Sequence, residues 1–100
     1  MKVRWTGPAL RDLEAIADFL SETNPDRALD TARLIFEKGQ SLRQHPLRGR
    51  RAPKKRPWRE LFLAPLPYVV AYEVREAEVV ILRVWHMSQD RYRVSRKKRD

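Results

Sequence analysis

The chain has 100 residues, no cysteine and a formal net charge of +9. This length fits one domain of ordinary size, and the lack of cysteine excludes disulfide frameworks and thiolate zinc sites. No stretch approaches the roughly 20 apolar residues that a membrane-spanning helix needs, and no signal-peptide-like run stands at the N-terminus. We therefore expect a soluble cytoplasmic protein that makes no use of a membrane.

Two basic clusters hold 13 of the 22 Lys and Arg residues. Residues 47–59 (LRGRRAPKKRPWR) carry seven basic and no acidic side chains, and residues 91–100 (RYRVSRKKRD) carry six basic and one acidic. Such clusters favour polyanions because binding releases counterions. They are also what a solubilising loop and a frayed tail look like. We favour a polyanion or an acidic protein segment as the partner.

The N-terminal half reads as a strand followed by two helices. Alternation predicts a short strand over residues 2–6, and Pro8 suits the first position of a helix. Apolar residues at helical spacing predict that this helix runs to residue 22. Asn24 and Pro25 then predict the cap and first residue of a second helix, which ends near residue 44. Two amphipathic helices joined by a short turn form a helical hairpin.

The C-terminal half reads as a loop followed by three strands. Prolines, arginines and lysines predict a loop over residues 46–57, and strands are predicted over 58–63, 67–74 and 79–85, the last two as an antiparallel hairpin. The order β-α-α-β-β-β predicts an α+β fold in which the helical hairpin packs on one face of an antiparallel sheet. We expect a single domain over residues 1–90 and a basic tail over 91–100.

Alternation along the strands also predicts which side chains face the helices. In the last strand one face carries Val80, Leu82, Val84 and His86, and the other carries Val79, Ile81, Arg83 and Trp85. A buried face should not carry an unpartnered charge, so Arg83 is assigned to the open side unless it pairs with Glu73. Arg59 is assigned to the same side as Arg83, with Trp58 opposite. The open side is then basic and partly aromatic, and His86 points towards the helices.

Five stretches, in this order and spacing, resemble one protein superfamily. They are W…A…DLEAIADFL (5–20), PDRA (25–28), L…HPLRGR (42–50), RELFLAPLPYVVAYEV (59–74) and VVILRVWH (79–86). Together they resemble the RelE/ParE superfamily, the plasmid-stabilisation-type toxins of bacterial type II toxin–antitoxin modules. The resemblance covers about residues 2–90. It implies a toxin that arrests growth and is neutralised by a cognate antitoxin, and an acidic antitoxin segment would suit the charge of this chain.

One functional class in the superfamily cleaves messenger RNA. Members similar to RelE do so in the ribosome without a metal, and the chemistry needs a base, an acid and cations near the scissile phosphate. Candidate catalytic residues are Arg59, Arg83 and His86, with Tyr92 available to stack on a base. His86 has a simpler interpretation as the residue that ends a strand. The fold alone does not choose between classes.

The other class, similar to ParE, inhibits DNA gyrase. The HPLRGR and RVWH stretches look more like this class, so we expect a gyrase inhibitor. An endoribonuclease and an inactive antitoxin-binding relative remain the alternatives, which leaves open whether the chain is an enzyme. Polyanion or target contacts are expected at Arg50, Lys54, Lys55, Arg56, Tyr92 and Arg93. Antitoxin contacts are expected at Trp85 and Arg83, and no metal or cofactor is expected.

Overall fold

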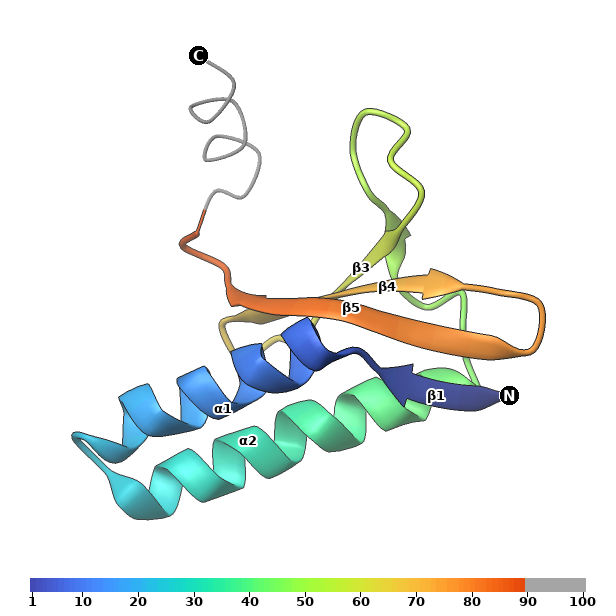
Figure 1. Ribbon diagram of the computed structural model, residues 1–100. Helices are drawn as coiled ribbons and strands as arrows, with labels where there is room; N and C mark the ends of the chain where they lie inside the picture. The colour runs from blue at the N-terminus through green and yellow to red at the C-terminus, as the bar shows by residue number, and fades with distance from the viewer. Residues whose placement is uncertain (90–100) are drawn as a thin grey trace.

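The structure is a computed structural model that describes residues 1–89, and a pair of helices lies along one face of a five-stranded sheet (Figure 1). The elements are β1 Lys2–Trp5, α1 Gly7–Ser21, α2 Pro25–Gln40, the short 3-10 helix η1 Ser41–Arg43, β2 Arg50–Arg51, β3 Arg59–Phe62, β4 Tyr68–Val74 and β5 Glu78–His86. This is the predicted two-layer α+β arrangement. Neither described helix is both long and apolar enough to cross a bilayer. The domain boundary at residue 90 and the tail over 91–100 stay predictions, because they fall at the limit of the described residues.

Both helices begin at a side-chain cap, of which the sequence predicted the one at Asn24 and not the one at Thr6. Asn24 caps α2 by accepting the N–H of Arg27 at 3.2 Å, with Pro25 in the first turn. Thr6 caps α1 by accepting the N–H of Ala9 at 3.2 Å. The Thr6 hydroxyl also donates to the carbonyl of Leu82 at 3.1 Å, so this cap fixes the start of α1 to β5. The second helix ends at Gln40, earlier than predicted, and continues as η1.

The sheet is mixed, where the sequence predicted an antiparallel one. Its order is β1-β5-β4-β3-β2, and β1 runs parallel to β5 while the remaining pairs are antiparallel. Alternation identifies a strand and its faces but not its neighbour or direction, which is why the pairing of β1 was missed. The two-residue strand β2 lies inside the predicted loop. So short a strand, among arginines and prolines, shows no alternation by which it could be predicted.

A β-bulge in β5 changes which of its residues face the helices. Ala71 pairs with Arg83 but Tyr72 pairs with Ile81, so Leu82 is an extra residue in β5. An extra residue reverses the alternation. Val84 therefore faces the helices as predicted, whereas Ile81, predicted on the open side, also joins the helix-side core. The prediction for the first half of β5 is wrong for this reason.

The main core lies between the sheet and the helices. Its buried members are Ala9, Ile35, Leu42, Leu61, Leu63, Tyr68, Val70, Tyr72, Val79, Ile81 and Val84. Trp5 packs against its edge, stacks on Phe36 with ring centroids 5.2 Å apart, and donates from Nε1 to Gln40 at 2.9 Å. A Cβ on Gly39 would lie 2.5 Å from this indole, so only glycine lets β1 and α2 approach so closely.

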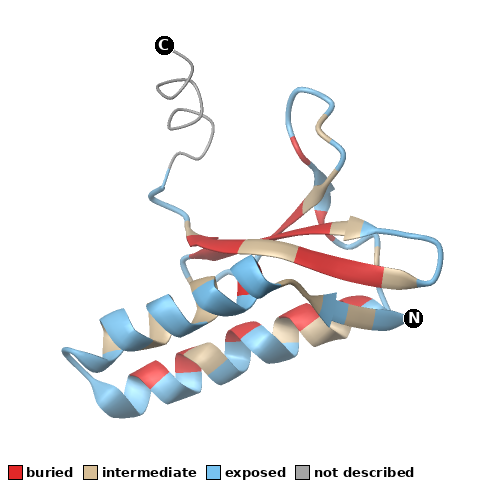
Figure 2. Cartoon of the chain, in the orientation of Figure 1, coloured by how far each residue is buried: buried red, intermediate tan, exposed pale blue. Residues whose placement is uncertain are grey.

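A second, smaller core lies on the side of the sheet away from the helices. Val69, Ala71 and Trp85 form it, and Trp58 packs against them. Trp85 is only 9% exposed, and consecutive residues along β4 and β5 are buried (Figure 2). Trp58 therefore lies on the opposite side from the predicted one. Trp58, from the segment that joins β2 to β3, therefore covers part of the side predicted to be open.

Candidate functional site

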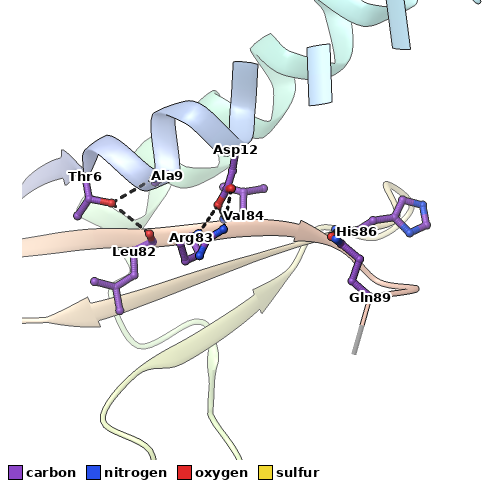
Figure 3. Close-up of polar contacts among 8 residues, drawn as sticks. All are labelled: Thr6, Ala9, Asp12, Leu82, Arg83, Val84, His86 and Gln89. Atoms are coloured by element: carbon purple, nitrogen blue, oxygen red, sulfur yellow. Dashed lines mark hydrogen bonds and ion pairs between the residues drawn. The ribbon is translucent and has the colours of Figure 1, made fainter. Parts of the chain in front are cut away.

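Arg83 is bound to helix α1. Its Nε and Nη2 donate to the two carboxylate oxygens of Asp12 at 2.7 and 3.0 Å, and Asp12 also accepts the backbone N–H of Val84 at 2.9 Å (Figure 3). These hydrogen bonds raise the pKa of Arg83. Glu73 bonds Arg75 instead, at 2.7 Å. By strand pairing Arg83 shares the side of Ala71 and Trp85, away from the helices, as predicted. Its guanidinium nevertheless binds Asp12, so it is neither a free cation on that side nor the partner of Glu73.

Arg59 lies on the helix side of the sheet, not on the predicted open side. It pairs across the strands with Tyr72, a member of the main core. Its Nη1 donates to the carbonyl of Gly49 at 2.9 Å. The cause is Trp58, which belongs to the second core and so turns the next residue towards the helices.

Tyr72 and Arg59 together hold the chain that precedes β2. The Tyr72 hydroxyl accepts the N–H of Gly49 at 2.7 Å and donates to the carbonyl of Pro46 at 2.8 Å. Burial raises the pKa of Tyr72, while the bond from Gly49 and the charge of Arg59 act in the opposite direction. A Cβ on Gly49 would lie 2.6 Å from the hydroxyl oxygen. The HPLRGR stretch therefore has a structural role that sequence reasoning missed.

His86 ends β5 with its ring engaged locally. Nδ1 accepts the backbone N–H of Ser88 at 3.0 Å and lies 2.8 Å from the Ser88 hydroxyl. Because a backbone N–H only donates, a neutral ring in this arrangement carries its proton on Nε2. The ring meets Tyr68 edge-on with centroids 5.3 Å apart, so His86 lies on the helix side as predicted.

A groove opens between α1 and the adjoining ends of β4 and β5, and we call it the α1 groove. Its volume is about 440 Å³, and it is lined by Asp12, Ala15, Ile16, Phe19, Tyr68, Val84, Trp85, His86, Ser88 and Gln89. Phe19 is 70% exposed at this groove. A second hollow of about 390 Å³ shares Tyr68 and reaches the turn between the helices. Burial raises the pKa of Tyr68, opposed by the charge of Arg27.

The hairpin tip, residues 52–58, carries the predicted target-binding cations. Lys54 and Lys55 are exposed and have φ angles of 61° and 55°. The guanidinium of Arg56 lies 5.3 Å from the Trp58 ring centroid. Just below the tip, Arg50 lies 4.5 Å from the Phe62 ring and 3.7 Å from Glu60. The structure thus groups four of the predicted cations, whereas Tyr92 and Arg93 lie outside the described residues.

The candidate catalytic residues do not converge on one point. Arg59 binds Gly49 beneath β3, Arg83 binds Asp12 beside β5, and β4 separates these two strands. Only His86 lines the α1 groove. Among residues 1–89 no group of three His, Asp or Glu side chains is placed to hold a metal ion. Sequence reasoning missed the roles of Asp12, Gly49 and Tyr72. The sequence around a residue does not show which distant residue it will contact.

Comparison with known proteins identifies the family. The model of the ParE toxin of type II toxin–antitoxin systems matches residues 3–91. Toxin RelE2 of Caulobacter vibrioides is 38% identical over 88 residues, which cover 88% of this chain and 97% of that protein. A chain in the structure of the chromosomal ParDE system from P. aeruginosa is 32% identical with a TM-score of 0.76, covering 86% of this chain and 95% of that one. The conserved hypothetical protein HP0894 from Helicobacter pylori, 21% identical, shares the fold with a TM-score of 0.60 over 89% of this chain and 97% of its own. The chain belongs to the ParE toxin family of the RelE/ParE superfamily, the toxins of type II toxin–antitoxin systems.

Proposed function

We propose that this toxin arrests growth by inhibiting DNA gyrase and that a cognate antitoxin neutralises it. The HPLRGR and RVWH stretches resemble those of ParE-type toxins. This resemblance implies gyrase as the target. The structural support is the separation of Arg59, Arg83 and His86. Cleavage of RNA needs an acid, a base and cations within hydrogen-bond reach of one phosphate. Here the two arginines are held by Gly49 and Asp12 in different places.

The two functional classes separate in parallel assays of the purified toxin. We expect the toxin to block supercoiling of relaxed plasmid by gyrase and to leave messenger RNA intact in a translation extract. Prior mixing with the cognate antitoxin should restore supercoiling, which controls for contaminants. Codon-positioned cuts in the messenger RNA with normal supercoiling would establish the endoribonuclease instead. Normal supercoiling and intact messenger RNA together would establish an inactive relative, and either result rejects the proposal.

We further propose that the antitoxin covers the α1 groove. Type II toxins are neutralised by a partner that binds them, and this groove offers apolar walls on both sides. Ile16 and exposed Phe19 come from α1, and Trp85 comes from the end of β5. The Arg83 side chain, 41% exposed, lies beside it. This keeps both predicted antitoxin contacts, with Trp85 acting as a wall of the groove rather than as an exposed anchor.

Phe19 tests this docking site. Phe19→Ser removes an apolar side chain that the antitoxin would bury, and burial of such a side chain contributes about 1.5–3 kcal/mol, equivalent to roughly a 10- to 100-fold change in Kd. Leu29→Ser is the matched control, because Leu29 is 62% exposed on α2 and does not line the groove. Titration calorimetry should show weaker binding for Phe19→Ser alone. Equal affinity of both variants would exclude the groove.

A further inference from the structure

The turn at the hairpin tip has a backbone that lysine does not favour. The N–H of Arg56 bonds the carbonyl of Pro53 at 3.4 Å, and the two residues between them, Lys54 and Lys55, both have positive φ. Turns of this kind favour Asn-Gly, because a Cβ is strained in the left-handed region. The turn geometry therefore does not explain why two lysines stand at these positions. The positive charges of their ammonium groups would explain it.

The tip is also the part of the described chain where cations face solvent with little opposing charge. Lys54 and Lys55 are exposed, as are Arg48, Arg50 and Arg51 at its base. The acidic residue nearest in sequence, Glu60, is 3% exposed and lies 3.7 Å from Arg50. The segment that joins β2 to β3 projects away from the helices (Figure 1). A projecting, cationic turn suits a polyanion.

The aromatic rings near the tip point to a duplex rather than a single strand. Single-stranded nucleic acids are held largely by stacking of bases on open aromatic faces. Trp58 has the Arg56 guanidinium over its ring and packs into the second core, and Phe62 lies under Arg50. A two-stranded β-ribbon fits the major groove of B-form DNA, whereas the major groove of A-form RNA is too narrow for side chains to read.

We propose that the hairpin tip, residues 52–58, binds the phosphate backbone of duplex DNA, with Lys54 and Lys55 as the principal contacts. Lysine is a compact point charge that suits phosphates without a fixed orientation, so the binding is independent of base sequence. The proposal concerns DNA alone and does not depend on gyrase as the target of the toxin.

The test is a salt series on the full chain with a fluorescent DNA duplex of arbitrary sequence. The variant Lys54→Asn/Lys55→Gly removes both charges and supplies the residues that the turn favours, so it should fold at least as well as the parent. Loss of two phosphate contacts should reduce the slope of log K against log salt by about 1.8 and weaken binding roughly tenfold or more near physiological salt. Thermal unfolding of the variant checks its folded state.

The matched control is Arg11→Gln/Arg33→Gln, which removes two exposed cations from the helices and leaves the same net charge. It should retain most of the affinity and the slope. Equal losses in the two variants would show that net charge alone matters and would overturn the proposal, as would an unchanged slope for the tip variant. Tighter binding of single-stranded RNA than of the duplex would also reject it. Inhibition of gyrase by the tip variant is scored separately, so failure of one proposal leaves the other standing.

Discussion

The helix side of the sheet and the hairpin tip use their cations differently. On the helix side, Arg59 donates to the carbonyl of Gly49, and from the edge of β5 the Arg83 side chain reaches Asp12 of α1. At the tip, Lys54 and Lys55 are exposed on a strained turn. The arginines proposed from the sequence as catalytic thus bind other parts of the fold, whereas the lysines proposed as target contacts are exposed to solvent. What separates the two roles is whether an acceptor lies within reach, and this is a property of the fold.

The largest expected effect breaks the helix-side arrangement at Gly49. In Gly49→Ala the new Cβ would lie 2.6 and 2.7 Å from Tyr72 atoms and 3.0 Å from the backbone oxygen of Glu60. Overpacking and loss of the bond to Tyr72 should lower the free energy of unfolding by about 3 kcal/mol. Urea unfolding measures this. In the control Gly7→Ala the nearest atom is the flexible end of Arg11 at 3.3 Å, so the change should stay within about 0.5 kcal/mol.

A smaller effect is expected at the Asp12–Arg83 contact. Asp12→Ala removes an acceptor from Arg83 and leaves the N–H of Val84 without its partner. The Arg83 side chain is 41% exposed, so water compensates part of the loss, and we expect about 2 kcal/mol. Glu14→Ala, two residues along on an exposed position of α1, should change the stability by less than about 0.5 kcal/mol. Similar losses in both variants would show that Asp12 acts only through the charge of the helix.

The smallest of the three effects on stability is expected at Tyr72, and its dependence on pH distinguishes it from the other two. Tyr72→Phe leaves the N–H of Gly49 without an acceptor and should cost about 1.5 kcal/mol at neutral pH. The pKa of Tyr72 is raised above its ordinary 10.0 by burial. Its contribution is therefore fully present below pH 10 and is lost as the pH rises through the raised value. The stability of the parent should fall above pH 10, and that of Tyr72→Phe should fall less steeply.

Tyr68→Phe is the matched control for the tyrosine experiment. The pKa of Tyr68 is also raised by burial, but its hydroxyl has no hydrogen bond among the described residues. This variant should cost less at neutral pH while keeping the alkaline loss that belongs to Tyr72. If both tyrosine variants cost the same at neutral pH, the bond between Tyr72 and Gly49 contributes nothing measurable.

The sequence predicted the elements of the fold better than it predicted the faces of the strands. The cap at Asn24 and the two-layer order followed from local chemistry, because caps and periodicity act over a few residues. The side of the sheet that Ile81 faces could not be predicted in this way, because one extra residue at Leu82 reverses the alternation beyond it. Arg59 was assigned to the wrong side because nothing in the sequence indicates that Trp58 packs in a second core. The candidate site depended on such pairings, so its residue types were predictable and its geometry was not.

The start of α1 has a consequence for how this protein associates with other chains. β1 pairs with β5 only as far as Ile81. Beyond that point Thr6 donates to the carbonyl of Leu82 and Asp12 accepts the N–H of Val84. The side chains of Thr6, which caps α1, and of Asp12, which lies within α1, thus occupy part of an edge that would otherwise be open to strand addition and aggregation. A partner that extends this sheet by a strand has to do so along the outer edge of β1 or of β2, and the second half of β5 is closed to it.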